Sequence, residues 1–424
     1  MRLIFVARSV FKSFLVHILF LTDNFPPEVN APASRSYEHC REWVVAGHEV
    51  TVITCVPNFP NGRVFSGYRN RIYQSEIISN IKVVRVWSYI TANSGFLKRI
   101  LDYISFMFMA VFFGLFVKRV DLIVGTSPQF FTVFGAHMLS VFKRKPWVFE
   151  LRDIWPESIR AVGVMRQSRT LDFLEKVELF LYRRAIRIVS VTHSFKESLI
   201  NRGIDGSKIN VITNGVDLAR FKPAQKNSEL LLKHKIEGSF IVGYIGTHGM
   251  AHSLETLLAA AKILKEQYAA EDIHFLMLGD GANKNYLLER AQKEEIDNVL
   301  FVDSVSKDDV VEYWSLLDVS IIHLKKSDLF KMVIPSKIFE SMAMGVPIAH
   351  GVFGESSSII REDQIGLVFE PENAQSLVDV LLRFKRDLNL ISNCRKNCLR
   401  AAKHYDRKRL AVDMLKILES VVDP

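Results

Sequence analysis

The sequence predicts an α/β protein of two doubly wound domains, each built on a parallel sheet. Runs rich in Val, Ile and Leu alternate with helical stretches along the 424 residues, a pattern typical of parallel strands covered by helices on both faces. The same scheme occurs once in each half of the chain. A polar stretch near residues 217–237, with Pro223 and several Lys, Gln, Asn and Ser residues, separates the halves. The length also fits two or three domains.

The first predicted domain comprises residues 1–222. Its first strand is expected at residues 16–21 and is followed by a helix near residues 35–46. Further strands are expected at residues 50–55, 82–86, 122–125, 147–151 and 186–191. Residues 1–16 lack a small-residue cleavage site. We therefore expect a leading extension, or a start codon assigned too early, rather than a signal peptide.

The second predicted domain comprises residues 223–406 and repeats this order. Its strands are expected at residues 240–245, 274–279, 299–302, 319–323, 347–349 and 366–369. A last segment, residues 407–424, contains a helix near residues 407–422. This helix is expected to pack back across the junction between the domains.

Residues 100–117 form an apolar, aromatic segment with Lys-Arg pairs at both ends. Its length lies at the lower edge for a membrane span, about 17–25 residues. A span is not predicted, because Asp102 and Ser105 interrupt the segment and the next strand must pair in the same sheet. Two interpretations remain open. The helix is either buried between the sheet and its neighbours, or it dips one face into lipid with its basic ends on anionic headgroups.

The chain carries 55 Lys and Arg against 46 Asp and Glu, a net charge of +9. Such an excess suits solubility, nucleic acid, an anionic membrane or phosphate-bearing substrates. Nucleic acid is disfavoured, since the sequence has no aromatic RNA-binding signature and no zinc-finger spacing. The four cysteines, at positions 40, 55, 394 and 398, lack metal-site spacing. They fit a reducing cytoplasm.

Several motifs follow one another in a characteristic order: TDNFPPE at 22–28, GHEVTVIT at 47–54, PNFPNG at 57–62 with GY at 67–68, ELRDIWPES at 150–158, NGVD at 214–217, PSKIFE at 335–340 and MAMGVPI at 342–348. As a set they resemble the family-4 glycosyltransferases of GT-B fold, in the branch that makes O-antigen and capsule. Within that branch the chain resembles transferases assigned to L-fucosamine-type sugars. The resemblance runs from about residue 17 to the C-terminus.

The resemblance implies two Rossmann-like domains facing across a cleft. The second binds a nucleotide sugar, with a UDP-sugar expected, and the first binds the acceptor, a glycan on a polyprenyl diphosphate. It implies transfer with retention and no metal or other cofactor, at the inner face of the bacterial plasma membrane. The sequence has no Asp-x-Asp pair of the kind that holds a metal diphosphate. Helix N-termini, amides or Lys, Arg and His side chains must then neutralise the leaving diphosphate.

The helix predicted to open at Pro335 is the main candidate for the donor site. Amides around Ser336 and Lys337 are expected to bind the diphosphate, and the resemblance places Glu340 on the ribose. The alternative is an ordinary helix start. The chain departs from the family at Met332, where a glutamate is frequent, and after the first strand of the second domain, where Arg and Lys are frequent. There it has Gly246, Thr247, Gly249 and His252. His252 is expected either to donate to phosphate or to be a surface histidine that caps the next helix.

Arg152 and Asp153 follow a strand of the first domain, at the edge where doubly wound sheets bind ligands. Asp153 is expected to orient the acceptor hydroxyl and Arg152 to meet an acceptor phosphate; the alternative is a salt bridge that fixes the next turn. His193 is a similar candidate, either catalytic or structural. Gly354 and Glu355 open another helix and are expected to contact the donor.

No motif for a covalent nucleophile is present, so we expect same-face displacement, in which a leaving-group oxygen takes the proton. Two rivals remain open. One is a sugar-nucleotide 2-epimerase of similar fold, which needs no lipid acceptor. The other is a non-catalytic partner subunit, suggested by Met332 and the missing Arg and Lys.

Overall fold

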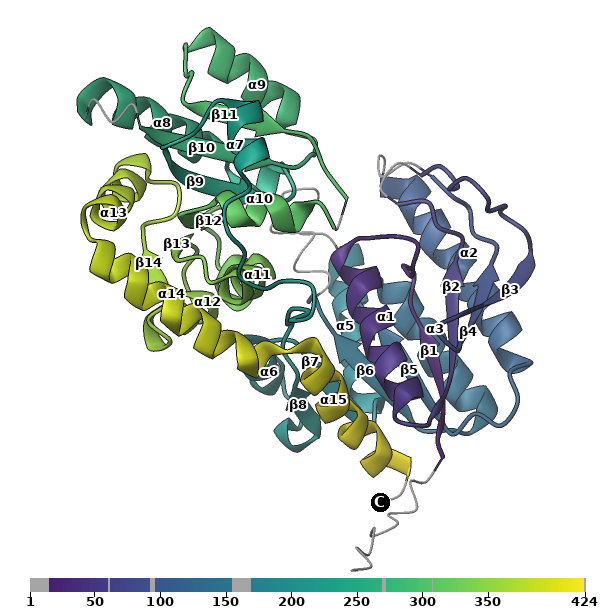
Figure 1. The fold of residues 1–424 in the computed structure, drawn as a ribbon. Coiled ribbons are helices and arrows are strands. Elements are labelled where there is room, and N and C mark those ends of the chain that lie inside the picture. The colour runs from purple at the N-terminus through teal and green to yellow at the C-terminus, as the bar shows by residue number, and fades with distance from the viewer. Residues whose placement is uncertain are drawn as a thin grey trace, which may run out of the picture. The chain divides into compact units, whose positions relative to one another are not determined.

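The computed structural model describes residues 15–59, 62–91, 96–154, 169–268, 272–306 and 308–422. The chain forms two compact units (Figure 1). Unit 1 consists of Met1–Glu150, Leu181–Ile188 and Ala411–Pro424, and unit 2 consists of Leu151–Phe180 and Val189–Leu410. Residues 1–14 of the expected leading extension lie outside the described residues.

The first sheet has eight strands in the order β3-β4-β2-β1-β5-β6-β7-β8. They are β1 (His17–Leu21), β2 (Glu49–Cys55), β3 (Tyr73–Ile78), β4 (Ile81–Val86), β5 (Leu122–Thr126), β6 (Trp147–Leu151), β7 (Arg187–Ser190) and β8 (Ile209–Val211). The pairs around β1 are parallel, as predicted. Two edge strands were not predicted: β3, which runs antiparallel to β4, and the three-residue β8.

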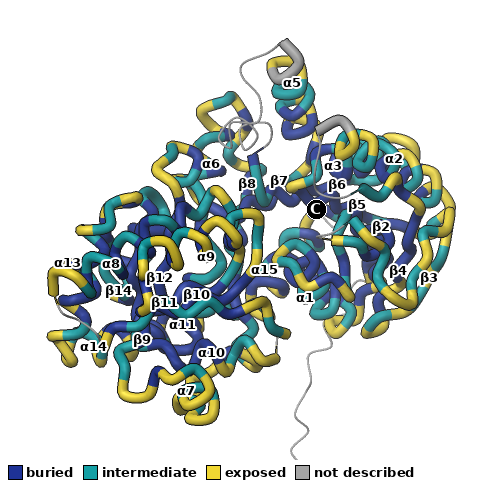
Figure 2. Tube along the Cα trace, turned by 90° about the horizontal axis from the view of Figure 1, so that it is seen from above, coloured by how far each residue is buried: buried dark blue, intermediate teal, exposed yellow. Residues whose placement is uncertain are grey.

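The second sheet is parallel, in the order β11-β10-β9-β12-β13-β14. Its strands lie where the sequence predicts them: β9 (Phe240–Ile245), β10 (Ile273–Leu278), β11 (Val299–Val302), β12 (Val319–His323), β13 (Ile348–Gly351) and β14 (Gly366–Val368). Two apolar clusters, one around Trp314 and Phe339 and the other around Leu257 and Phe275, form its core. The central strands accordingly lie in the buried colour of Figure 2.

Helices connect the strands of both sheets. The first group is α1 (Ala31–Val45), α2 (Phe96–Leu115), α3 (Phe130–Lys143), α5 (Arg169–Arg184) and α6 (His193–Asn201). The second group is α7 (Ser228–His234), α8 (Glu255–Tyr268), α9 (Lys284–Lys293), α10 (Val310–Leu316), α11 (Lys337–Met344), α12 (Glu355–Glu362), α13 (Ala374–Arg386), α14 (Leu388–Ala402) and α15 (Arg407–Val422). The Trp43 indole donates to the Ala411 carbonyl at 2.9 Å, which ties α15 to α1 within unit 1.

Helix α2 is buried along one face only. Phe106, Met107, Ala110 and Val111 are buried. Phe108 and Phe112 on the helix and Phe116 just beyond its end are 59%, 54% and 67% exposed. No helix of the described residues is both long and apolar enough to cross a bilayer. The prediction that this segment does not span is confirmed. The interpretation as a fully buried helix fits only its inner face.

Each sheet has a switch point, where the chain leaves two neighbouring strands toward opposite edges. In the first sheet it lies between β1 and β5, and in the second between β9 and β12. Ligands of doubly wound sheets bind outside the carboxyl ends of the strands at such points. The residues that follow these four strands are therefore the first to consider as sites.

Candidate functional site

Lys337 reaches the end of β9 at the switch point of the second sheet. Its Nζ lies 3.8 Å from the centroid of the Tyr244 ring, a cation–π distance. Gly246 follows β9 with φ +144°. A Cβ on Gly246 would lie 2.2 Å from Lys337 Cε and 2.6 Å from Nζ. The positive φ favours glycine at this position, and any side chain on residue 246 would push the flexible end of Lys337 aside. Gly246 and Lys337 therefore lie in direct contact.

When no anion is bound, the surroundings of Lys337 favour the neutral form of its side chain. Removal from water lowers the pKa of Lys337 to about 7, and Glu340 on the same helix opposes the shift. Burial and the nearby Lys337 lower the pKa of His252 to about 3. The imidazole is thus neutral near pH 7 in the unliganded protein. The contacts of Lys337 and His252 with a diphosphate stay predictions.

The loop after β9 is clamped to the loop after β10 by backbone contacts. The His248 amide donates to the Asp280 carbonyl at 2.8 Å, and the Asn283 amide donates to the His248 carbonyl at 2.9 Å. A Cβ on Gly281 would lie 2.6 Å from that carbonyl. The His252 carbonyl accepts from His323 Nδ1 at 2.8 Å. These bonds hold the Gly246–His252 segment in place without its side chains.

Helix α11 begins at Lys337, with Ser336 at the N-cap and no side-chain cap. The amides of Ile338 and Phe339 donate to the carbonyls of Pro335 and Ser336, each at 3.1 Å. The amides of Ser336 and Lys337 precede these bonds at the positive end of the helix, where an anion binds favourably. Glu340 lies on this helix, half-buried and with contacts of its own. Its bond to ribose stays a prediction.

Glu355 is the first residue of α12, and its side chain lies against the start of α6 within unit 2. Its carboxylate accepts from the amides of His193 at 2.9 Å and Ser194 at 2.7 Å, so it satisfies two free amides of that helix. His193 is exposed. Gly354 precedes Glu355, and a Cβ there would lie 2.0 Å from the Lys331 carbonyl. These contacts give Gly354 and Glu355 structural roles, and their contact with the donor stays a prediction.

The remaining candidates lie on elements other than α11. Arg152 and Asp153 follow β6, half-buried and engaged with other residues, and most of the motif after them lies outside the described residues. Thr247 is exposed, and its carbonyl accepts from the Tyr244 hydroxyl at 2.8 Å. Met332 ends a short 3₁₀ turn, Leu329–Met332.

Two family models match the chain, one for each predicted domain. The model described as Glycosyltransferase Family 4 matches residues 33–220, and the model described as Glycosyl transferases group 1 matches residues 228–403. The chain is a two-domain glycosyltransferase. Its curated relatives include the WcaI glycosyl transferase of colanic acid biosynthesis from Escherichia coli K12, 24% identical over 85% of this chain and 90% of that protein.

A second relative of this glycosyltransferase is an Escherichia coli UDP-Gal:alpha-D-GlcNAc-diphosphoundecaprenol alpha-1,3-galactosyltransferase. It is 28% identical over 56% of this chain and 63% of that protein. Among solved structures, Anabaena HepE in complex with UDP and glucose has a TM-score of 0.71 at 16% identity, over 95% of this chain and 99% of that one. WaaG, a glycosyltransferase involved in lipopolysaccharide biosynthesis, has a TM-score of 0.67 at 12% identity, over 94% of this chain and 99% of that one. These likenesses show the GT-B fold and confirm the predicted fold class.

Sequence reasoning overlooked two residues beside the site of the glycosyltransferase. Tyr244, which carries Lys337 on its ring, reads as an ordinary core position of a strand. His248 is fully buried, and burial together with Lys284 and Lys337 lowers its pKa to about 4. Its spacing of four from His252 marks no known site. Tyr244 and His248 come from β9 and the loop after it, whereas Lys337 comes from α11. Packing between distant segments, rather than local sequence, therefore brings these groups together.

Proposed function

We propose that this glycosyltransferase moves a sugar from a nucleotide diphosphate donor, expected to be a UDP-N-acetylamino sugar, onto a lipid-linked glycan. The transfer proceeds with retention at the inner face of the bacterial plasma membrane, in surface-polysaccharide synthesis. The position of Lys337 against Gly246 and Tyr244, at the switch point of the second sheet, carries the donor half of the proposal. The relatives named for colanic acid and for a diphosphoundecaprenol acceptor support the rest.

The chemistry follows from what the site offers. Lys337 and the amides at the start of α11 are placed to stabilise the charge that develops on the leaving diphosphate. A leaving-group oxygen takes the proton of the acceptor hydroxyl, so that attack and departure occur on one face. The protein orients both substrates and supplies the positive charge. In this proposal Asp153, Arg152 and His193 serve the acceptor, and no metal takes part.

The exposed face of α2 supports the membrane part of the proposal. Ile72, Trp87, Met109 and Phe112 line an open, apolar hollow of about 640 Å³. Exposed aromatic patches of this kind mark protein or membrane contacts. Lys98, Arg99, Lys118 and Arg119 are exposed near the two ends of the helix. Apolar side chains between basic ends suit an anionic bilayer surface.

An acceptor-dependence assay tests the proposal. The purified protein is incubated with a panel of UDP-sugars, with and without GlcNAc-diphosphoundecaprenol in vesicles, and released UDP is measured. We expect one donor to give UDP release that requires the lipid. Conversion of a UDP-sugar to its 2-epimer without lipid would instead identify an epimerase. Absence of both reactions across the panel would contradict the proposal for this acceptor.

A further inference from the structure

A second group of polar side chains lies at the switch point of the first sheet, between β1 and β5. Asp23 follows β1, and Gln129 follows β5 at the start of α3. Gln129 Nε2 donates to Asp23 Oδ2 at 2.8 Å, and Asn24 Nδ2 donates to the same oxygen at 2.9 Å. The two strands that define the switch point are therefore joined, at their carboxyl ends, through one carboxylate.

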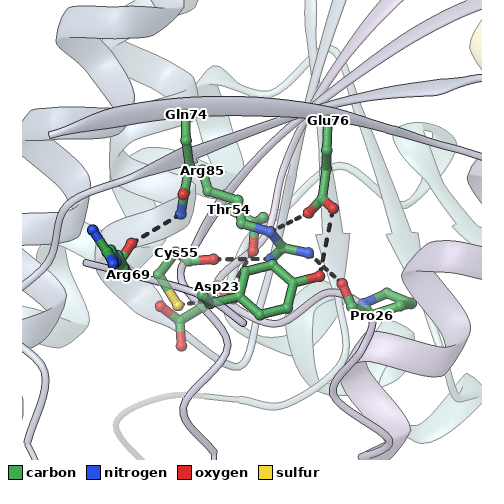
Figure 3. A network of polar contacts seen from close by, with 9 residues as sticks. Asp23, Pro26, Thr54, Cys55, Arg69, Gln74, Glu76 and Arg85 are labelled. Atoms are coloured by element: carbon green, nitrogen blue, oxygen red, sulfur yellow. Dashed lines mark hydrogen bonds and ion pairs between the residues drawn. The ribbon is translucent and has the colours of Figure 1, made fainter. Parts of the chain in front are cut away.

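The backbone around Asp23 is held by neighbouring strands (Figure 3). The Asp23 carbonyl accepts from the Thr54 hydroxyl at 2.9 Å and from the Cys55 thiol at 3.0 Å. Arg85 lies nearby, where its guanidinium donates to the carbonyls of Cys55 and Pro26 and pairs with Glu76. The position of Asp23 is thus fixed before any ligand arrives, which is what a binding group requires.

The hydrogen bonds of Asp23 and Gln129 leave acceptor capacity unused. Asp23 Oδ1 accepts from no N–H or O–H group of the described residues, although the side chain is only half-buried. Gln129 Oε1 is buried and has no partner in the described part of the chain. A buried acceptor without a donor is costly, so Gln129 Oε1 calls for a ligand that donates. Asp23 Oδ1 can accept from the same ligand.

The charges around Asp23 indicate the class of ligand. No Lys, Arg or His of the described residues pairs with its carboxylate. Burial and the carboxylates of Asp102 and Glu28 raise the pKa of Asp23. A phosphate would be repelled by this set of groups. Neutral hydroxyl groups can donate hydrogen bonds to Asp23 and Gln129 without adding a negative charge.

We propose that Asp23 and Gln129 form a subsite for hydroxyl groups of the acceptor sugar. The inference rests on the proposed glycosyl transfer and adds residues to the acceptor side, separate from Arg152 and Asp153 after β6. One hydroxyl donates to Asp23 Oδ1 and a neighbouring hydroxyl donates to Gln129 Oε1. The sugar is thereby oriented at the carboxyl ends of β1 and β5, where the fold favours ligands.

Glycoside binding tests the subsite. The probes are the octyl α-glycosides of GlcNAc, GalNAc, glucose and galactose, titrated against the full chain and followed by calorimetry or saturation-transfer NMR. We expect at least one glycoside to bind the parent protein, with an affinity about tenfold lower in Asp23→Asn and in Gln129→Met. Asp121→Asn is the matched control. The Asp121 carboxylate lies at the amino ends of β1 and β5, away from the subsite, where it accepts from the His17 amide at 3.0 Å.

UDP binding is measured on the same variants to separate the two proposals. It should stay within about twofold of the parent, since neither residue lies in the donor site. Equal glycoside affinity in parent, Asp23→Asn and Gln129→Met would overturn the subsite, as would a parent that binds none of the four glycosides. Failure of the parent protein to bind UDP would instead overturn the proposed transfer. If Asp23→Asn does not fold, as judged by its thermal transition, Gln129→Met decides alone.

Discussion

At the scale of single residues, the proposed donor site depends most on Lys337. Its ammonium lies over the Tyr244 ring and beside Gly246, with a pKa lowered to about 7 by removal from water. A diphosphate beside it favours the charged form and raises that pKa again. Binding of the donor and protonation of Lys337 should therefore be coupled.

The first prediction is that UDP affinity falls as the pH rises above about 7. The charged form of Lys337 binds the diphosphate, and deprotonation of the free protein removes it, so the affinity should fall by up to about tenfold for each pH unit. Titration calorimetry across the pH range measures this. Lys337→Arg, which keeps its charge throughout, serves as the control and should show a flatter profile. A flat profile in the parent would show that Lys337 does not bind the diphosphate.

Glu340→Ala is the second test at this scale. If Glu340 accepts two ribose hydroxyls, its loss should weaken binding of uridine and of UDP alike, by about 1.5–3 kcal/mol for each bond at most. Lys337→Ala should weaken UDP more than uridine, because its partner is phosphate. Titration of each variant with both ligands gives the pattern. Unchanged uridine binding by Glu340→Ala would remove the ribose assignment.

At the scale of elements, the sequence predicts the interior strands better than the edges. β1, β5, β9 and β12 are continuous apolar runs and were located closely. β3, Tyr73–Ile78, alternates half-buried and exposed positions and contains Gln74, Ser75 and Glu76, so it resembles a loop. β8 has only three residues. The start of α11 was predictable from Pro335, but its approach to Gly246 was not, because it depends on packing between segments about ninety residues apart.

The loop after β9 gives a third prediction. Gly246→Ala should displace Lys337, because the new Cβ would overlap Cε, and should weaken UDP binding about tenfold. Gly238→Ala is the matched control. Gly238 also has a positive φ, +72°, but nothing lies within 4 Å of its added Cβ. Gly238→Ala should lose about 1–2 kcal/mol of stability from backbone strain. Gly246→Ala should lose at least as much, because its φ of +144° lies outside the left-handed helical region that other residues tolerate. Denaturant unfolding measures both losses. Equal UDP affinity in the two variants would contradict the placement of Lys337.

Helix α2 gives the fourth prediction. Replacing Lys98, Arg99, Lys118 and Arg119 by Gln should release the protein from anionic vesicles by about tenfold or more, since each basic residue near such a surface contributes about 1 kcal/mol. Vesicle sedimentation measures it. The control replaces four exposed lysines of unit 2 by Gln: Lys222, Lys233, Lys235 and Lys293. Equal binding by the two quadruple variants would argue against α2 as the membrane contact.

At the scale of the whole molecule, the fold brings residues that lie far apart in the chain to each switch point, where they form one candidate site each. The sequence motifs identified Lys337 as the start of a helix and Gly246 as the end of a strand, but did not indicate that the two residues are in contact. The motif at residues 22–28 was recognised, but Asp23 within it was not singled out, because its partner Gln129 is 106 positions away. Motif spacing reports local structure, and contacts across a sheet depend on strand order.

Metal independence is the fifth prediction and concerns the complete reaction. With positive charge supplied by Lys337 and by helix amides, transfer should persist in excess chelator. The assay is UDP release at saturating substrates, with and without EDTA. A loss of more than about tenfold that magnesium or manganese restores would contradict a metal-free reaction.

We propose that Lys337 binds a nucleotide diphosphate at the switch point of the second sheet. Comparing Lys337→Met with the parent protein tests this binding. Titration calorimetry with UDP and with uridine gives four affinities near neutral pH. We predict that the variant folds, binds uridine within about twofold of the parent and binds UDP at least about tenfold more weakly. Equal UDP affinity in parent and variant, or a parent that binds no UDP, would contradict the claim.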